Sequence, residues 1–272
     1  MKHTRRVGLA LFVAVALSAA SQLTGQDART RVSQQSDGQL RFTVKLRPEV
    51  CGSGQNIWRA RDGRSQTNWG NGGYSRDVEF DVEFDVECDA GPGRVVIDRS
   101  GGTVRDVRFY VGGRWRATTG VTDLGALGTR AAADLLLDIA RTNDGKAGRN
   151  AIFPLTVIDS VVIWRDLLQL ARDEGRPRET RKQAVFWLGQ LAEAPATQGL
   201  DELVGEAGLD REVREQAIFA LSQRPAGEGI PALVKVVRTS RDPALRKKAL
   251  FWLGQSNDPR GLALIEELLA KR

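Results

Sequence analysis

The chain has 272 residues, of which 41% are hydrophobic and 27% are charged, and it carries a net charge of +6, two cysteines and one histidine. This length exceeds the usual size of a single core, so we expect more than one domain. The histidine is His3, and because it lies in a segment that we expect to be removed, catalytic Ser–His and Cys–His pairs are excluded from the mature protein.

The first residues have the three parts of a secretory signal peptide. Lys2, Arg5 and Arg6 precede an apolar run over 7–17, and small residues follow as far as Ala20. We predict a cleaved signal peptide at 1–20 and a periplasmic or secreted protein; the run is too short to span a membrane, so an uncleaved anchor is the weaker reading. Cleavage lowers the net charge from +6 to about +3, which does not favour a nucleic-acid partner.

Residues 21–39 are polar and unpatterned, which predicts a disordered leader. A small β domain is expected over residues 40–117. Apolar and polar residues alternate over 40–46 and 77–89, and further strands are expected at 94–98 and 104–111 around a turn at 100–102. Cys51 and Cys88 lie near strand ends, and an even cysteine count in an oxidising compartment predicts one disulfide between them. A zinc site or a reactive thiol has less support, because no second ligand pair is present.

The strand at 77–89 carries carboxylates along one face. They could bind a cation, but calcium sites usually draw their ligands from a curved loop. The other reading is that basic residues on adjacent strands balance this charge. These residues are Arg41, Lys45, Arg94, Arg105 and Arg108.

A glycine-rich stretch at 52–75, expected to be a loop, contains Trp58, Trp69 and Tyr74 beside Asn and Arg residues. Such aromatic faces suit a sugar or a peptide ligand. The alternative is that the rings only close the core of the domain.

The second half of the chain repeats an eleven-residue sequence motif. Its copies start at Arg181, Arg214 and Arg246, 33 and 32 residues apart, a spacing typical of stacked helical repeats. Apolar residues recur every three or four positions, and a second amphipathic segment follows each copy, at 200–204, 230–237 and 262–269. We expect helical hairpins over residues 118–272, with a further helix at 129–141 and one that Pro154 shortens or kinks.

The segment Asp242-Pro-Ala-Leu-Arg-Lys-Lys-Ala-Leu-Phe-Trp-Leu-Gly-Gln-Ser-Asn-Asp-Pro-Arg-Gly-Leu-Ala-Leu-Ile-Glu-Glu-Leu-Leu269 resembles a HEAT repeat of the short bacterial type that is also found in phycobilin-lyase-like proteins. The whole chain resembles secreted bacterial HEAT-repeat proteins. The resemblance implies an α+β, mostly α protein with a C-terminal HEAT-type α-solenoid behind a small disulfide-linked β domain that caps it. A repeat family describes an architecture, so it implies partner binding and no reaction.

The resemblance also suggests roles for particular residues. Arg181, Arg214 and Arg246 should pair with Asp210 or Asp242 of a neighbouring turn. Polar residues on the second helices, which line the concave side in such solenoids, are the candidates for binding a partner. They are Asp201, Glu202, Lys235, Arg238, Glu266 and Glu267.

We therefore expect an exported, non-catalytic scaffold that binds a protein partner in the cell envelope or outside the cell, with no cofactor, no metal and no catalytic residue. The alternative is a carbohydrate- or cell-wall-binding module that uses Trp58, Trp69 and Tyr74. An enzyme with Glu83 and Glu87 as its acid and base has less support, because nothing on a solvated face would separate their pKa values.

Overall fold

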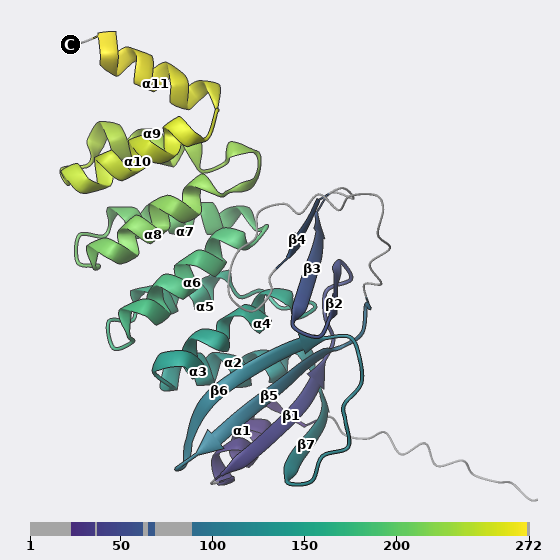
Figure 1. Ribbon diagram of the computed structural model, residues 1–272. Coiled ribbons are helices and arrows are strands. Elements are labelled where there is room, and N and C mark those ends of the chain that lie inside the picture. Colours follow the sequence, from purple (N-terminus) through teal and green to yellow (C-terminus); the bar gives the residue numbers. More distant parts are fainter. Residues whose placement is uncertain (1–22, 36, 62–64, 69–88, 271–272) are drawn as a thin grey trace, which may run out of the picture.

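The computed structural model describes residues 23–35, 37–61, 65–68 and 89–270, and it is an α+β protein. A β part lies at one end of a stack of helices (Figure 1). The predicted signal peptide, most of the acidic strand at 77–89, Cys88, Trp69 and Tyr74 lie outside the described residues. Of the helices in the described residues, none is long and apolar enough to cross a bilayer.

The main sheet has the strand order β6-β5-β1-β7. Its strands are β1 (Gly38–Val44), β5 (Gly93–Ser100), β6 (Thr103–Val111) and β7 (Val121–Leu127). β1 pairs antiparallel with β5 and parallel with β7. Leu40, Phe42 and Val44 are buried, while Arg41 lies on the opposite, outer face because side chains alternate along a strand. The strands predicted near 40–46, 94–98 and 104–111 are confirmed.

A smaller sheet with the order β2-β3-β4 stands beside the main one. Its strands are β2 (Val50–Ser53), β3 (Asn56–Arg61) and β4 (Ser65–Asn68). They occupy part of the segment expected to be a loop, so that expectation is wrong. One of the glycines that suggested a loop, Gly52, serves close packing: a Cβ added there would lie 2.6 Å from the Asn56 carbonyl oxygen and 2.8 Å from Cβ of Val111.

The predicted disordered leader is also corrected, because residues 25–34 form a helix. α1 (Gly25–Gln34) begins with a capping box in which Thr24 and Asp27 satisfy each other's backbone N–H groups. Ala28 and Val32, one turn apart, are both buried, and α1 packs on α2 (Thr129–Thr142). Two apolar residues on one face are enough to order this segment once α2 is present.

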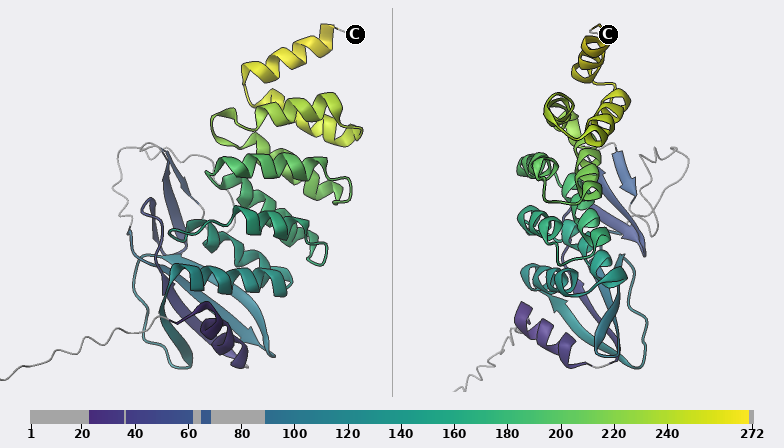
Figure 2. Two further views of the ribbon diagram at one scale, coloured as in Figure 1. Left: turned by 180° about the vertical axis from the view of Figure 1, so that it is seen from behind. Right: turned by 90° about the vertical axis from the view of Figure 1, so that its left-hand side faces the viewer.

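The remaining helices form hairpins that stack in sequence order (Figure 2). α6, α8 and α10 contact one another and form a first row, and α5, α7, α9 and α11 form a second row. Pro154 lies in a short helix, as predicted. The bounds are α3 (Gly145–Asn150), α4 (Ile152–Val157), α5 (Trp164–Arg172), α6 (Arg178–Gln190), α7 (Ala194–Gly205), α8 (Arg211–Ser222), α9 (Ile230–Thr239), α10 (Pro243–Gln255) and α11 (Pro259–Ala270).

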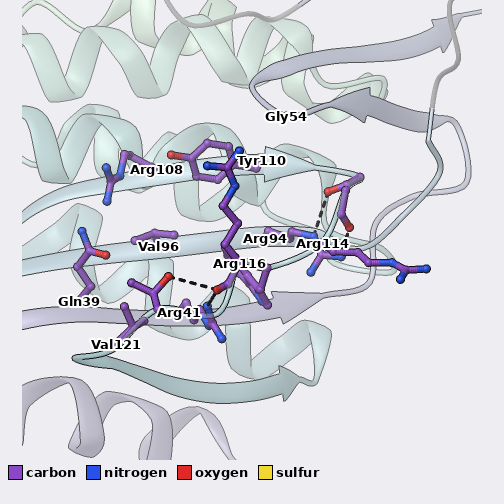
Figure 3. Close-up of a pocket in the computed structure, with 14 residues that line it drawn as sticks. Gln39, Arg41, Gly54, Arg94, Val96, Arg108, Tyr110, Arg114, Arg116 and Val121 are labelled. Atoms are coloured by element: carbon purple, nitrogen blue, oxygen red, sulfur yellow. Dashed lines mark hydrogen bonds between the residues drawn. The ribbon is translucent and has the colours of Figure 1, made fainter.

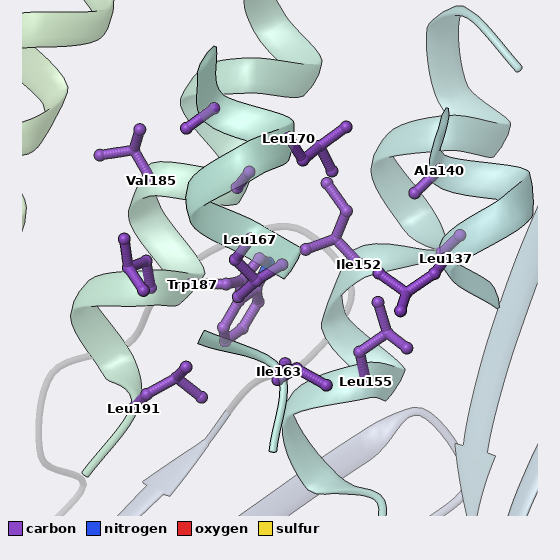
Figure 4. Packing of buried hydrophobic residues seen from close by; sticks show 14 of the residues in the cluster. Leu137, Ala140, Ile152, Leu155, Ile163, Leu167, Leu170, Val185, Trp187 and Leu191 are labelled. Atoms are coloured by element: carbon purple, nitrogen blue, oxygen red, sulfur yellow. The ribbon is translucent and has the colours of Figure 1, made fainter. Parts of the chain in front are cut away.

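One hydrophobic core runs from the sheet into the helices, and Figure 4 shows its part between α2 and α6. Aromatic rings continue it through the first row: Phe109 of β6 contacts Phe153 of α4 with centroids 5.7 Å apart, and Phe153 contacts Trp187 of α6 at 4.8 Å. The row ends with Phe219 of α8 and Trp252 of α10, 5.0 Å apart. The predicted border at 117/118 therefore does not separate two cores, and β7 beyond it belongs to the main sheet.

Candidate functional site

Charged side chains of the second row pair from one helix to the next. We call this set the charge ladder, and it links α5, α7, α9 and α11. Arg172 bonds with Glu202 at 3.0 Å and also with Glu206. Lys235 bonds with Asp201 at 2.8 Å, and Arg238 bonds with Glu267 at 2.7 Å.

The structure thus brings five of the six residues expected to bind a partner into one array, and the sixth, Glu266, is exposed beside Glu267. The pairs of the ladder are open to solvent: the side chains of Lys235 and Arg238 are 62% and 56% exposed. Sequence reasoning found these positions but not their pairing. An array of alternating sign offers a partner an extended pattern of charge.

The repeated arginines of the first row have structural roles. Arg181 is 6% exposed and bonds with Asp210 of the next repeat, as the resemblance suggested. Arg214 instead donates to the Val204 carbonyl at 2.9 Å, and Arg246 donates to the Ser240 carbonyl at 2.7 Å. Each of the three is used inside the protein, so they form no free basic row.

The aromatic stretch gives little support to a sugar site. Trp58 lies on β3 opposite Cys51 and is only 7% exposed, so little of its ring is open to a ligand. Trp69 and Tyr74 lie outside the described residues. The predicted disulfide stays a prediction because Cys88 also lies outside them, but the chains that flank both cysteines meet: Gly52 and Asp89 exchange backbone hydrogen bonds of 3.0 and 3.2 Å.

Sequence reasoning missed a hollow on the outer face of the main sheet. This arginine groove has a volume of about 390 Å³ and lies between the strands and the loop at 112–118 (Figure 3). Strand alternation turns its side chains outward, away from the core. The lining residues are Gln39, Arg41, Gly54, Arg94, Val96, Arg108, Tyr110, Gly112, Gly113, Arg114, Trp115, Arg116, Thr118 and Val121.

Two of the arginines hold the loop over the sheet. Arg41 donates to the Arg116 carbonyl at 3.1 Å and to Asp123 at 2.8 Å, and Arg94 donates to the Gly112 carbonyl at 3.0 Å. Their guanidinium carbons lie 5.0 and 5.3 Å from the Trp115 ring, within the range of a cation–π contact. Desolvation raises the pKa of Asp123, but hydrogen bonds from Gly125 and Arg41 outweigh it, so this pKa lies below its ordinary value and the pair with Arg41 is ionised at neutral pH.

The basic residues expected to balance the acidic strand have other contacts within the described part of the chain. Arg41 and Arg94 hold the loop, and Arg108 bonds with Asp98 at 3.0 Å. Lys45 bonds with Asp159 at 2.7 Å, and Arg105 donates to the Ser100 carbonyl at 3.1 Å. The repeated basic residues at outward strand positions were the signal that could have revealed the groove.

Comparison with known proteins supports the helical repeats. A family model of HEAT repeats matches residues 206–272, which cover α8 to α11. The chain thus contains a HEAT-repeat domain. A search of curated proteins finds no match to it.

Proposed function

We propose that this protein is an exported, non-catalytic scaffold whose stacked hairpins act as a HEAT-type α-solenoid and bind a protein partner through the charge ladder. The observation that carries the proposal is the ladder itself, in which charges of both signs from four successive helices form one array. HEAT repeats generally serve as interaction scaffolds, and an extended repeated surface suits a macromolecule better than a small substrate.

The ladder can exchange its internal partners for those of another protein at little cost. Exposed ion pairs contribute about 0.2–1 kcal/mol each, so replacing one with an intermolecular pair changes the free energy of the stack only slightly. The alternation of sign then selects a partner with the complementary order of charges and fixes its register.

The export and the absence of catalysis are supported by the sequence. The predicted signal peptide removes His3, and the predicted disulfide between Cys51 and Cys88 uses both cysteines. The mature protein then lacks the side chains that most often act as general base or nucleophile near neutral pH. Because a signal peptide directs export, we propose that the partner lies in the cell envelope or outside the cell.

The test inverts the ladder without breaking it. The variant Asp201→Lys/Lys235→Asp/Arg238→Glu/Glu267→Arg keeps the two pairs made by α9 but reverses their polarity, and it leaves the pairs of Arg172 unchanged. The matched control, Arg178→Glu/Glu212→Arg, swaps a pair of the first row that also joins two repeats, at 2.9 Å and with side chains 52% and 51% exposed. The tagged mature proteins are used to capture proteins from the envelope fraction of their own cells.

We expect the wild-type protein and the control to retain a common partner, and the inverted ladder to lose it while its melting temperature stays within a few degrees. Retention of that partner by the inverted variant would refute binding through the ladder. Turnover of an envelope substrate by the purified protein would refute the non-catalytic role.

A further inference from the structure

We propose that the arginine groove on the outer face of the main sheet is a binding site for a sugar that carries a carboxylate group, such as a uronic acid. This site is separate from the charge ladder, and the proposal does not depend on the function assigned to the ladder. It starts from the charge of the lining: the described residues there include five arginines and no acidic residue. A volume of about 390 Å³ lies in the range of small-ligand sites, which is roughly 300–1,000 Å³.

The register of the strands arranges these groups around an apolar floor. Val96 lies in the middle of the floor, opposite Arg108 on β6 and opposite Arg41 on β1. The neighbouring pair on the same face is Arg94 and Tyr110. A ligand above Val96 therefore has guanidinium groups on both sides and a phenol ring next to it.

The groove is held in shape before a ligand arrives. Arg41 and Arg94 fix the loop through its carbonyl groups, and both guanidinium groups contact the Trp115 ring of that loop. Preorganisation of this kind lowers the entropy lost on binding. Arg116, whose backbone is held by Arg41, extends over the strands toward Tyr110 in Figure 3 and is exposed.

Arg108 and Arg116 have accessible guanidinium groups in the lining of the groove. The side chain of Arg108 is 34% exposed and bonds with Asp98 through Nη2 at 3.0 Å, and Arg116 is exposed. A guanidinium group has five N–H donors in a fork that matches the two oxygens of a carboxylate. Arg108 and Arg116 are therefore the residues that we assign to the ligand's carboxylate.

The same surface favours a sugar over an acidic peptide. A bound peptide draws much of its affinity from main-chain hydrogen bonds to a strand edge, whereas the groove lies on the face of a sheet whose backbone groups already pair with neighbouring strands. A pyranose ring needs no backbone partner. Its hydroxyl groups can reach the side chains of Gln39 and Tyr110, which line the groove.

The experiment measures binding to the mature full-length protein by isothermal titration calorimetry at low salt. The ligands are galacturonate, galactose, trigalacturonate, hexaglutamate and inorganic phosphate. Arg108→Gln and Arg116→Gln test the assigned residues. Arg178→Gln, at an exposed position of the first row outside both sites, is the matched control, and circular dichroism confirms that each variant is folded.

We expect galacturonate to bind at least tenfold more tightly than galactose. Each groove variant should lose about tenfold in galacturonate affinity, and Arg178→Gln should lose none. Tighter binding of trigalacturonate than of galacturonate would identify a polymer as the source of the sugar, and equal binding would identify the free acid. The proposal is overturned if galacturonate does not bind, if hexaglutamate or phosphate binds equally well, or if both groove variants bind like the wild type.

Discussion

Replacing the buried Arg224 with methionine should weaken the junction between α6 and α8 more than any loss of an exposed charge. Arg224 follows α8, and its side chain is fully buried. It donates to carbonyl oxygens at the end of α6 and just after it, so it satisfies groups that the helix itself leaves unpaired. Its acceptors are the carbonyls of Gly189, Leu191 and Glu193, the hydroxyl of Thr197 and the carboxylate of Glu228.

The expected size of the effect follows from these contacts. A hydrogen bond from a charged group contributes about 1.5–3 kcal/mol, but bonds from one side chain are not additive. Glu228 is 39% exposed, so water can solvate it after the change, whereas the carbonyl of Leu191 stays buried. We therefore expect Arg224→Met, which keeps the volume of the stem, to lower the free energy of unfolding by about 3 kcal/mol, at the low end for a broken buried pair.

Urea unfolding followed by circular dichroism measures this difference, and hydrogen exchange locates it. Because each repeat contacts mainly its neighbours, exchange should rise in α8 to α11 and stay unchanged in α2 to α4. Arg214→Met is the control, since the side chain of Arg214 donates one hydrogen bond, to the Val204 carbonyl, and its loss should cost about 1 kcal/mol. Equal stability of the two variants would refute the role given to Arg224.

Gly189→Ala should destabilise the protein by about 1–3 kcal/mol in urea unfolding, because the new Cβ would lie 2.7 Å from Cβ of Ala220. Gly254→Ala lies at the equivalent place in α10, where the nearest neighbour of the new Cβ is Ile265 at 3.8 Å. This variant should stabilise the protein by up to about 1 kcal/mol. Destabilisation of both to the same extent would contradict this packing argument. Hydrogen bonds from the side chain and backbone of Arg260 lower the pKa of Asp258 to about 2, so its contribution to stability is complete above its unfolded pKa of about 3.9 and is lost as the pH falls through about 2. The difference in urea midpoint between wild type and Asp258→Asn should therefore shrink over that range, and a difference that is constant from pH 6 to pH 2 would argue against it. When a reductant opens the predicted disulfide, the mass of the exported protein should rise by that of two hydrogen atoms. Free alkylation of Cys51 and Cys88 in the native protein would disprove their pairing.

The helical repeats could be predicted because their signals are local. The recurring sequence motif indicates both the period and the apolar face of α6, α8 and α10. Asp242 caps α10 by accepting a hydrogen bond from the Ala244 N–H at 2.9 Å. Such features lie within one or two turns of each other. Stacking then follows, because a hairpin cannot bury its apolar face alone.

α1 and β7 could not be predicted, because tertiary contacts decide them. β7 has buried residues at Leu124 and Leu127, three apart, and Gly125 between them adopts a positive φ of 74°. This breaks the alternation that marks a strand. Its structure comes from pairing with β1, which shifts register between Arg41 and Thr43.

The candidate sites divide in the same way. The second-row positions followed from the repeat, but the bond between Lys235 and Asp201 joins residues 34 positions apart, and no local pattern specifies which charges meet. The arginine groove was missed because the loop at 112–118 is held over the sheet by long-range contacts, among them those with Arg41, Arg94 and Asp89, which no local pattern specifies.

The position of β1 has a consequence for the order in which the protein folds. β1 is the first strand in the chain yet lies inside the main sheet, and its bond from Arg41 to Asp123 of β7 spans 82 residues. Contacts over such separations form slowly, whereas a helical hairpin closes a short loop and forms fast. The helices should therefore be in place while the sheet is still incomplete. During that interval Phe153 lacks its contact with Phe109, and the uncovered end of the stack is the surface at which a newly made chain is most prone to associate with another.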